Sequence, residues 1–258
     1  MTEDAAGQNR PTASGDPSGA LRGAGNRTVV ITGAGRGLGL GLANHFATRG
    51  DRVIGTARSP EGAPDLAAVA DRVIPLDVAS DDSIAAAASA LDDLGHVDVL
   101  INNAGMDARA VGASATARGP MELSRADFLA VMDVNAAGPL LVTRALRPLL
   151  RQAGAALVVN ISSQLGAISF GGAHGSDIAY NASKSALNMI TVRTATDLQS
   201  ERIAVVCLHP GWVRTDMGGS SASLGVEESA AAIVTTVDGL SLADSGRFLR
   251  WDGSPHAW

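Results

Sequence analysis

A tyrosine and a lysine stand four positions apart in the stretch Y-N-A-S-K, and each is the single residue of its type among 258. Tyr180 and Lys184 share a face if this stretch is helical, because residues four apart are neighbours on a helix surface. A free phenol has a pKa of about 10, and a neighbouring ammonium stabilises the phenolate and lowers that pKa. The pair therefore predicts a tyrosine that donates a proton to a carbonyl oxygen, assisted by the lysine.

A glycine-rich turn near the start of the chain points to a second kind of chemistry. The letters T-G-A-G-R-G-L-G occupy residues 32–39, between an apolar run and a helical segment. Gly33 permits a tight turn, Gly37 lets the backbone approach a pyrophosphate at the positive end of the helix, and Gly39 allows close packing of helix on strand. Because the turn joins a strand to a helix, it predicts dinucleotide binding rather than an ordinary glycine loop.

The end of the second apolar run indicates which dinucleotide binds. An acidic residue there would hydrogen-bond a ribose 2′-hydroxyl and select NAD. The run instead ends G-T-A-R-S, and Arg58 can pair with a 2′-phosphate, since a guanidinium binds phosphate bidentately. Arg36, inside the glycine turn, can reach the same group from the other side. The two arginines favour NADPH over NADH, and the alternative is that either one is a solvated surface residue.

Short β-branched runs alternate with longer Ala/Leu-rich segments after residue 27. The expected strands are Thr28–Thr32, Arg52–Ala57, Arg72–Leu76, Val97–Ile101, Ala155–Ile161, Arg202–Leu208 and Arg247–Leu249. The expected helices are Gly37–Arg49, Asp81–Asp93, Arg125–Gln152, Ile178–Ser200 and Glu227–Asp238. This alternation predicts one doubly wound α/β domain of the Rossmann type, a mostly parallel seven-stranded sheet with helices on both faces. One expected helix, 125–152, is too long to be a single regular helix. Pro139 is expected to bend it or to mark a place where another segment approaches it closely.

Composition and charge exclude several other classes of protein. The net charge of −6 and the pI of about 5.3 argue against nucleic-acid binding. The single cysteine, Cys207, excludes an intramolecular disulfide framework and a cysteine-cluster metal site. Residues 1–26 lack apolar periodicity, so we expect a disordered leader before a domain at 27–258. Without an apolar run of signal-peptide or membrane-spanning length, we expect a cytoplasmic protein with no membrane partner.

Further motifs resemble those of the short-chain dehydrogenase/reductase family, and the resemblance covers residues 27–258. They accompany the glycine turn and Y-x-x-x-K and follow the family order: N-N-A-G at 102–105, D-V-N-A-A-G-P with Asn135, V-N-I-S-S with Ser163, and the turn Pro210-Gly211. The string L-H-P-G-W-V-R-T-D-M-G-G and a tail that ends at Trp258 are similar to the C-factor and sniffer-type carbonyl reductases within that family.

This resemblance implies a catalytic set of four residues. Ser163 would hold and polarise the substrate carbonyl, and Tyr180 would deliver the proton. Lys184 would lower the tyrosine pKa and hydrogen-bond the nicotinamide ribose, while Asn135 would anchor a water that links the lysine to solvent. The implied NADP(H)-binding residues are Gly33, Arg36, Gly37, Leu38, Gly39, Arg58, Asp77, Val78, Asn103, Ala104, Gly105, Tyr180, Lys184, Pro210, Gly211, Val213 and Thr215.

Some of these roles are more specific than others. Asp77 would meet the adenine, and Val213 and Thr215 would bind the carboxamide or the pyrophosphate. Ser162 and Ser163 point to opposite faces if the strand continues through them, and only the resemblance favours Ser163. The glycine-rich loop before Tyr180 is expected to lie over the substrate, where His174 either contacts the substrate or is solvated.

Together these observations predict an NADPH-dependent carbonyl reductase or ketoreductase that acts on a small ketone or aldehyde. Two alternatives stay open. The same residues suit a biosynthetic enzyme that performs dehydration, epimerisation or cyclisation, because a tyrosine can move protons without net redox. The C-factor resemblance also allows a non-enzymatic NADP-binding signalling protein. The family resemblance further implies a homodimer or a homotetramer.

Overall fold

A parallel sheet forms the centre of the protein in the computed structural model, which describes residues 21–171, 174 and 176–258. Its strands are β1 (Thr28–Ile31), β2 (Arg52–Ala57), β3 (Arg72–Pro75), β4 (Val99–Asn102), β5 (Ala156–Ile161), β6 (Ile203–His209) and β7 (Phe248–Arg250). All neighbours pair in parallel, in the order β3-β2-β1-β4-β5-β6-β7. This confirms the doubly wound sheet, and its switch point lies between β1 and β4.

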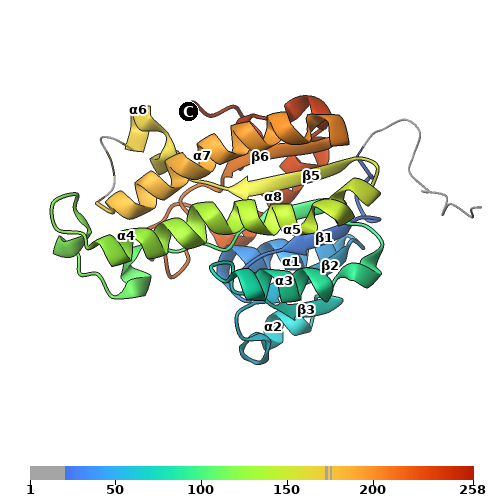
Figure 1. The fold of residues 1–258 in the computed structure, drawn as a ribbon, viewed down its shortest axis with the longest axis horizontal. Coiled ribbons are helices and arrows are strands. Elements are labelled where there is room, and N and C mark those ends of the chain that lie inside the picture. The colour runs from blue at the N-terminus through green and yellow to red at the C-terminus, as the bar shows by residue number, and fades with distance from the viewer. Residues whose placement is uncertain (1–20, 172–173, 175) are drawn as a thin grey trace, which may run out of the picture.

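Helices cover both faces of this sheet (Figure 1). They are α1 (Gly37–Thr48), α2 (Pro64–Ala67), α3 (Asp81–Ser89), α4 (Arg125–Met132), α5 (Gly138–Gln152), α6 (Ile168–Gly171), α7 (Ile178–Leu198) and α8 (Val226–Gly239). The buried side chains of α3, α5 and the end of α7 pack on one face of the sheet, and those of α1 and α8 pack on the other face. Successive β1 side chains alternate between the two cores, Val30 in the first and Ile31 in the second, so the strand is a continuous apolar run.

The seven expected strands and five expected helices are present, and the differences lie at their ends. The expected helix 81–93 ends at Ser89 as α3, and a 3₁₀ turn at Asp92–Leu94 follows. β4 begins at Val99, two residues later than expected. The helices α2 and α6 were not expected, because four residues are too few to show a helical period.

The long expected helix is interrupted as its proline predicts. A π-helical turn, Asp133–Ala137, separates α4 from α5, and Pro139 stands in the first turn of α5. Proline has no N–H, so Pro139 cannot donate to the carbonyl four residues earlier, which belongs to Asn135. The π-helical turn lies at this missing hydrogen bond. A second proline, Pro148, lies inside α5 without interrupting it.

The same stretch, residues 125–152, is the one helix in the described part of the chain that could cross a membrane by length and composition alone. In α5, however, Leu146 and Leu150 are buried against the sheet, whereas Arg147 and Arg151 are exposed on the other side. A buried apolar side opposite a charged side is the pattern of a helix that covers a sheet. We therefore interpret it as a core helix.

The predicted leader, 1–26, lies outside the described residues up to position 20. Its last residues contact the domain. Leu21 packs against the core on the α1 and α8 face, and Arg22 Nε lies 3.0 Å from the Asp98 Oδ1 atom. The contacts of the domain thus extend back to Leu21.

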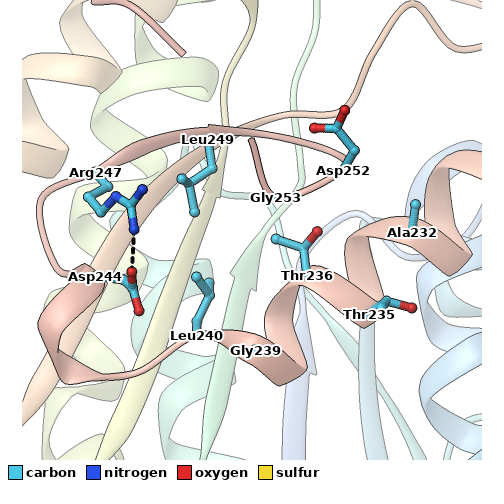
Figure 2. A pocket seen from close by; sticks show the side chains of 10 residues that line it. All are labelled: Ala232, Thr235, Thr236, Gly239, Leu240, Asp244, Arg247, Leu249, Asp252 and Gly253. Carbon is cyan, nitrogen blue, oxygen red and sulfur yellow. Dashed lines mark hydrogen bonds and ion pairs between the residues drawn. The ribbon is translucent and has the colours of Figure 1, made fainter. Parts of the chain in front are cut away.

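A groove of about 560 Å³ follows the edge of the sheet, between the end of α8, the turn Leu242–Asp244 and β7 (Figure 2). Thr236 lines one side of it and Leu249 the other, and an ion pair between Arg247 and Asp244 crosses one end. In the described part of the chain, its lining includes none of the residues predicted for catalysis or cofactor binding. The candidate site lies instead at the carboxyl ends of the strands.

Candidate active site

The glycine turn between β1 and α1 has the backbone shape that its residues predict. Gly33 and Gly37 have φ angles of +63° and +56°, in the left-handed region that favours glycine. A Cβ atom at Gly39 would lie 2.4 Å from the Gly33 carbonyl oxygen, so a side chain has no room there. The first turn of α1, which holds Leu38, has neither a side-chain cap nor an acidic residue. The glycine turn and the free N–H groups at the start of α1 are therefore suited to the pyrophosphate of a dinucleotide.

The N-N-A-G segment after β4 is bound directly to this turn. The Thr32 hydroxyl oxygen accepts hydrogen bonds from the N–H groups of Asn103 and Ala104, both at 3.0 Å. The Asn103 side-chain amide in turn donates to the carbonyl oxygens of Thr32 and Gly33 at 3.0 and 3.1 Å. These hydrogen bonds fix the loop after β1 to the loop after β4, on the two sides of the switch point.

The two predicted phosphate-binding arginines have different surroundings. Arg58 is exposed directly after β2, and in the described part of the chain no ion pair involves it. The position of a Cβ at Gly35 lies 3.5 Å from the Ala57 side chain, so the glycine turn packs beside the end of β2. Arg36 is exposed and forms an ion pair with Asp216. Arg58 is thus free to meet a phosphate, and Arg36 would have to exchange partners.

Asp77 and Val78 lie just after β3, as predicted for the adenine side. The Asp77 carboxylate accepts a hydrogen bond from the Ala79 N–H at 3.0 Å, which fixes its direction at the surface. Val78 is buried and approaches Gly138, where a Cβ atom would lie 3.0 Å from the valine side chain. The adenine contact itself stays a prediction.

The Pro210-Gly211 turn leads a segment back over the glycine turn. Gly211 has a φ angle of +83°, and a Cβ there would lie 3.2 Å from the Trp251 ring. Val213 is buried, and the Thr215 methyl group lies 3.4 Å from the Cβ position of Gly37. The structure therefore brings Thr215 to the phosphate end of the predicted cofactor site, and Trp251 packs behind the turn.

The helix α7, which carries Tyr180 and Lys184, has a fixed starting point. Asp177 caps it, since one carboxylate oxygen accepts the Tyr180 N–H at 3.0 Å. The other oxygen accepts the Ala108 N–H at 2.8 Å, which ties α7 to the segment after β4. Asp177 is buried, and our reading of the sequence did not assign it a role. An aspartate directly before an expected helix is an N-cap signal that could have revealed it.

Lys184 lies one turn further along α7, fully inside the protein. Its ammonium donates to the Ile161 carbonyl oxygen at 2.8 Å and lies 3.6 Å from the Cβ position of Gly105. Burial lowers the pKa of Lys184 from 10.5 to about 8. The lysine thus holds its charge with little solvation, beside the N-N-A-G segment.

The Tyr180 phenol does not show the lowered pKa that the spacing predicts. The lysine Nζ atom lies 5.7 Å from the centre of the tyrosine ring. Burial raises the pKa of Tyr180 to about 12, the nearby Ser163 hydroxyl opposes this rise, and Asp107 and Asp177 add to it. Desolvation is therefore the largest influence on the pKa of this phenol, and Lys184 is not among the groups that shift it. The expected lowering is wrong for this state.

Asn135 sits in the π-helical turn and is fully buried. Its side-chain oxygen accepts the Met106 N–H at 2.8 Å, and its amide donates to the Met106 carbonyl at 2.7 Å and to the Ser183 hydroxyl at 2.9 Å. Ser183 precedes Lys184 on α7, and Gly105 lies beside the Asn135 side chain. Asn135 therefore joins α7 to the N-N-A-G segment, and the water that it would anchor stays a prediction.

The structure separates the two candidate serines after β5. The Ser162 hydroxyl donates to the Asn188 side-chain oxygen at 2.6 Å and is buried away from the phenol. Ser163 lies near enough to Tyr180 to affect its pKa, and its hydroxyl oxygen accepts the Leu165 N–H at 3.1 Å. Ser163 is therefore the serine that can share a carbonyl oxygen with the phenol.

Comparison with known proteins identifies the family of this site. The sequence profile of the family described as short chain dehydrogenase matches residues 27–223. The chain is a short-chain dehydrogenase/reductase. This dehydrogenase is 41% identical over 166 residues to C-signal of Myxococcus xanthus, which covers 64% of the chain and 94% of the relative. It is thus an oxidoreductase by family, as its motifs predict.

Solved structures support the carbonyl-reductase-like subgroup for this dehydrogenase. The NADPH-bound carbonyl reductase from chicken fatty liver matches with a TM-score of 0.82 and 33% identity, over 90% of this chain and 99% of that one. Carbonyl reductase Sniffer of D. melanogaster matches with a TM-score of 0.79 and 33% identity, over the same shares of the two chains. The predicted resemblance to this subgroup is confirmed.

Two histidines of the dehydrogenase have distinct environments. His174 is exposed and stacks on Phe170, with ring centres 4.2 Å apart, and its contact with a substrate stays a prediction. His209, before the Pro210-Gly211 turn, is buried, and burial lowers its pKa to about 3. His209 therefore stays neutral inside the fold.

Proposed function

We propose that this dehydrogenase reduces a ketone or an aldehyde with NADPH, with Tyr180 as the proton donor. One observation carries the proposal: Tyr180, Lys184 and Ser163 meet at the carboxyl end of β5, beside a glycine turn shaped for a dinucleotide. Solved relatives described as carbonyl reductases, one of them NADPH-bound, support this choice of cofactor and substrate class.

The glycine turn and the uncapped N-terminal end of α1 fit the pyrophosphate of the dinucleotide. Lys184 would meet the nicotinamide ribose, and Arg58 would pair with the 2′-phosphate. When bound, the nicotinamide supplies the hydride. The Tyr180 hydroxyl donates its proton to the carbonyl oxygen as negative charge develops there. Ser163 donates a second hydrogen bond to the same oxygen, which stabilises that charge. Lys184, held by Ile161, stabilises the phenolate that remains.

The proposal is tested with the purified protein and a panel of ketones, aldehydes and quinones. We expect loss of NADPH absorbance that depends on both enzyme and substrate, together with formation of the alcohol. Product analysis with and without NADPH distinguishes reduction from dehydration, epimerisation or cyclisation. A protein that binds NADPH but oxidises none across the panel would contradict the proposed reaction.

Arg58→Asp tests the choice of NADPH over NADH. The substitution removes the guanidinium that would pair with the 2′-phosphate and adds a carboxylate that repels it, so we expect NADPH affinity to fall roughly 10- to 100-fold. NADH affinity should change little or improve, because a carboxylate can accept the ribose 2′-hydroxyl. The matched control is Arg52→Asp, at the exposed opposite end of β2. Equal losses for both cofactors would contradict the assignment of Arg58.

We also propose that the protein is a homodimer or a homotetramer. Exposed apolar side chains on the long helices support this, namely Leu129 on α4, Leu140 on α5 and Met189 on α7. Light scattering on a sizing column tests it. A monomeric mass at micromolar concentration would contradict the proposal.

A further inference from the structure

A five-residue turn, 162–166, carries Ser163 from β5 towards α6, and α7 holds this turn at both ends. Within the turn, the Ser163 hydroxyl oxygen accepts the Leu165 N–H and its carbonyl oxygen accepts the Gly166 N–H, and the hydroxyl also interacts with the Tyr180 phenol. How well the hydroxyl is placed for that interaction depends on what fixes the two ends of the turn. Both ends are bound by the side chain of Asn188.

At the first end, the Ser162 hydroxyl donates to the Asn188 side-chain oxygen at 2.6 Å. Ser162 is 1% exposed and Asn188 5%, so water does not compete for this bond. The Ser162 N–H also donates to the Leu208 carbonyl oxygen at 2.8 Å, which continues the pairing of β5 with β6. This end of the turn is thus fixed to the sheet and to α7 at once.

At the second end, the Asn188 amide donates to the Gly166 carbonyl oxygen at 3.2 Å. The Ser185 hydroxyl donates to the same oxygen at 2.8 Å. A Cβ atom at Gly166 would lie 2.7 to 2.9 Å from main-chain and Cβ atoms of Lys184, so the turn is in direct contact with the backbone of the catalytic lysine. The end of the turn cannot shift without α7.

Asn188 shares its helix face with the catalytic pair. Tyr180, Lys184 and Asn188 follow one another at four-residue spacing on α7, so they point to the same side. A single helix face therefore bears the proton donor, the lysine and the residue that clamps the Ser163 turn. From this geometry we infer that Asn188, through Ser162 and Gly166, is a positioning residue that sets Ser163 against the Tyr180 phenol. The inference rests on the proposed function only for its kinetic test.

A double-mutant cycle with Ser163 tests the inference kinetically. Asn188→Ala is expected to lower kcat/KM roughly 10- to 100-fold, because a displacement of about 1 Å in a reacting geometry has effects of that size. The KM for NADPH should stay within about twofold. In a Ser163→Ala background, Asn188→Ala should cost no more than about twofold, since the side chain that it positions is already gone. A loss of the same size in both backgrounds would overturn the inference.

The control is Thr191→Val, which removes other buried hydrogen bonds of α7 without touching the turn: those that the Thr191 hydroxyl accepts from the Asn160 amide and the Cys207 thiol, and the one that it donates to the Leu187 carbonyl oxygen. It should leave kcat/KM within about twofold while lowering thermal stability like any lost buried hydrogen bond. If Asn188→Ala does not fold, Ser162→Ala removes one end of the clamp alone. It should give a smaller loss that likewise vanishes in the Ser163→Ala background.

A measurement without substrate separates this inference from the proposed function. Because Tyr180 is the only tyrosine, protein labelled with carbon-13 at the tyrosine Cζ gives a single NMR resonance. Ser163→Ala should shift this resonance, Asn188→Ala should shift it in the same direction, and Thr191→Val should leave it in place. A resonance that moves in Ser163→Ala but not in Asn188→Ala would overturn the positioning role, even in a protein that reduces no carbonyl.

Discussion

Tyr180→Phe is expected to lower kcat/KM for carbonyl reduction by about 10²- to 10⁴-fold, the usual contribution of a general acid. Phenylalanine keeps the ring and loses only the hydroxyl. The backbone bond from Tyr180 to Asp177 that starts α7 is unaffected, so the helix should remain. Steady-state kinetics at saturating NADPH measure the loss.

The fold and the cofactor affinity of Tyr180→Phe should change little. Three tryptophans remain in the variant, so their fluorescence still reports NADPH binding, and we expect a dissociation constant within about twofold of the unchanged protein. Thr196→Val, an exposed position on the same helix, is the matched control. Turnover within threefold or so of the unchanged protein would show that another group supplies the proton.

The architecture could be predicted because each of its signals is local. The β-branched runs and the helical segments give the seven strands and the long helices in order, and the glycine turn places the switch point. Pro139 lies at the break in the long helix, but a proline does not always break one, since Pro148 lies inside α5. Whether the chain bends, ends or widens into a π-helical turn depends on the side chains packed around Asn135.

The candidate site was predicted less completely, for a physical reason. Tyr180, Lys184 and Ser163 belong to motifs, whereas Thr32 and Asn188 act through contacts between residues distant in the chain. Spacing along one helix does not show which turn packs against it. The same limit explains the Tyr180 pKa. The sequence shows a lysine four residues away, but the burial that raises the pKa of the phenol exists only in the fold.

Lys184→Met is expected to abolish turnover and yet stabilise the cofactor-free protein. The ammonium is buried, and burial lowers its pKa from 10.5 to about 8, a change that corresponds to roughly 3 kcal/mol of unfavourable free energy while the charge is present. Methionine has a similar length without the charge. It leaves the Ile161 carbonyl without its donor, which costs about 1 kcal/mol. We expect the free energy of unfolding at pH 7 to rise by about 1 to 2 kcal/mol.

The direction of the pH dependence separates this cause of stabilisation from better packing. Between pH 8 and 10.5 the unfolded chain holds a proton on Lys184 that the folded protein has released, so the stability of the unchanged protein rises with pH through this window. The advantage of Lys184→Met should therefore be greatest below pH 8 and decline towards pH 10.5. Urea unfolding of both proteins at several pH values measures it, and Lys184→Arg, which stays charged, should gain nothing. If the gain in free energy of unfolding of Lys184→Met did not change with pH, better packing would be its cause. The expected decline of this gain with pH would mean that the fold keeps a destabilising buried charge because the proposed reaction needs it.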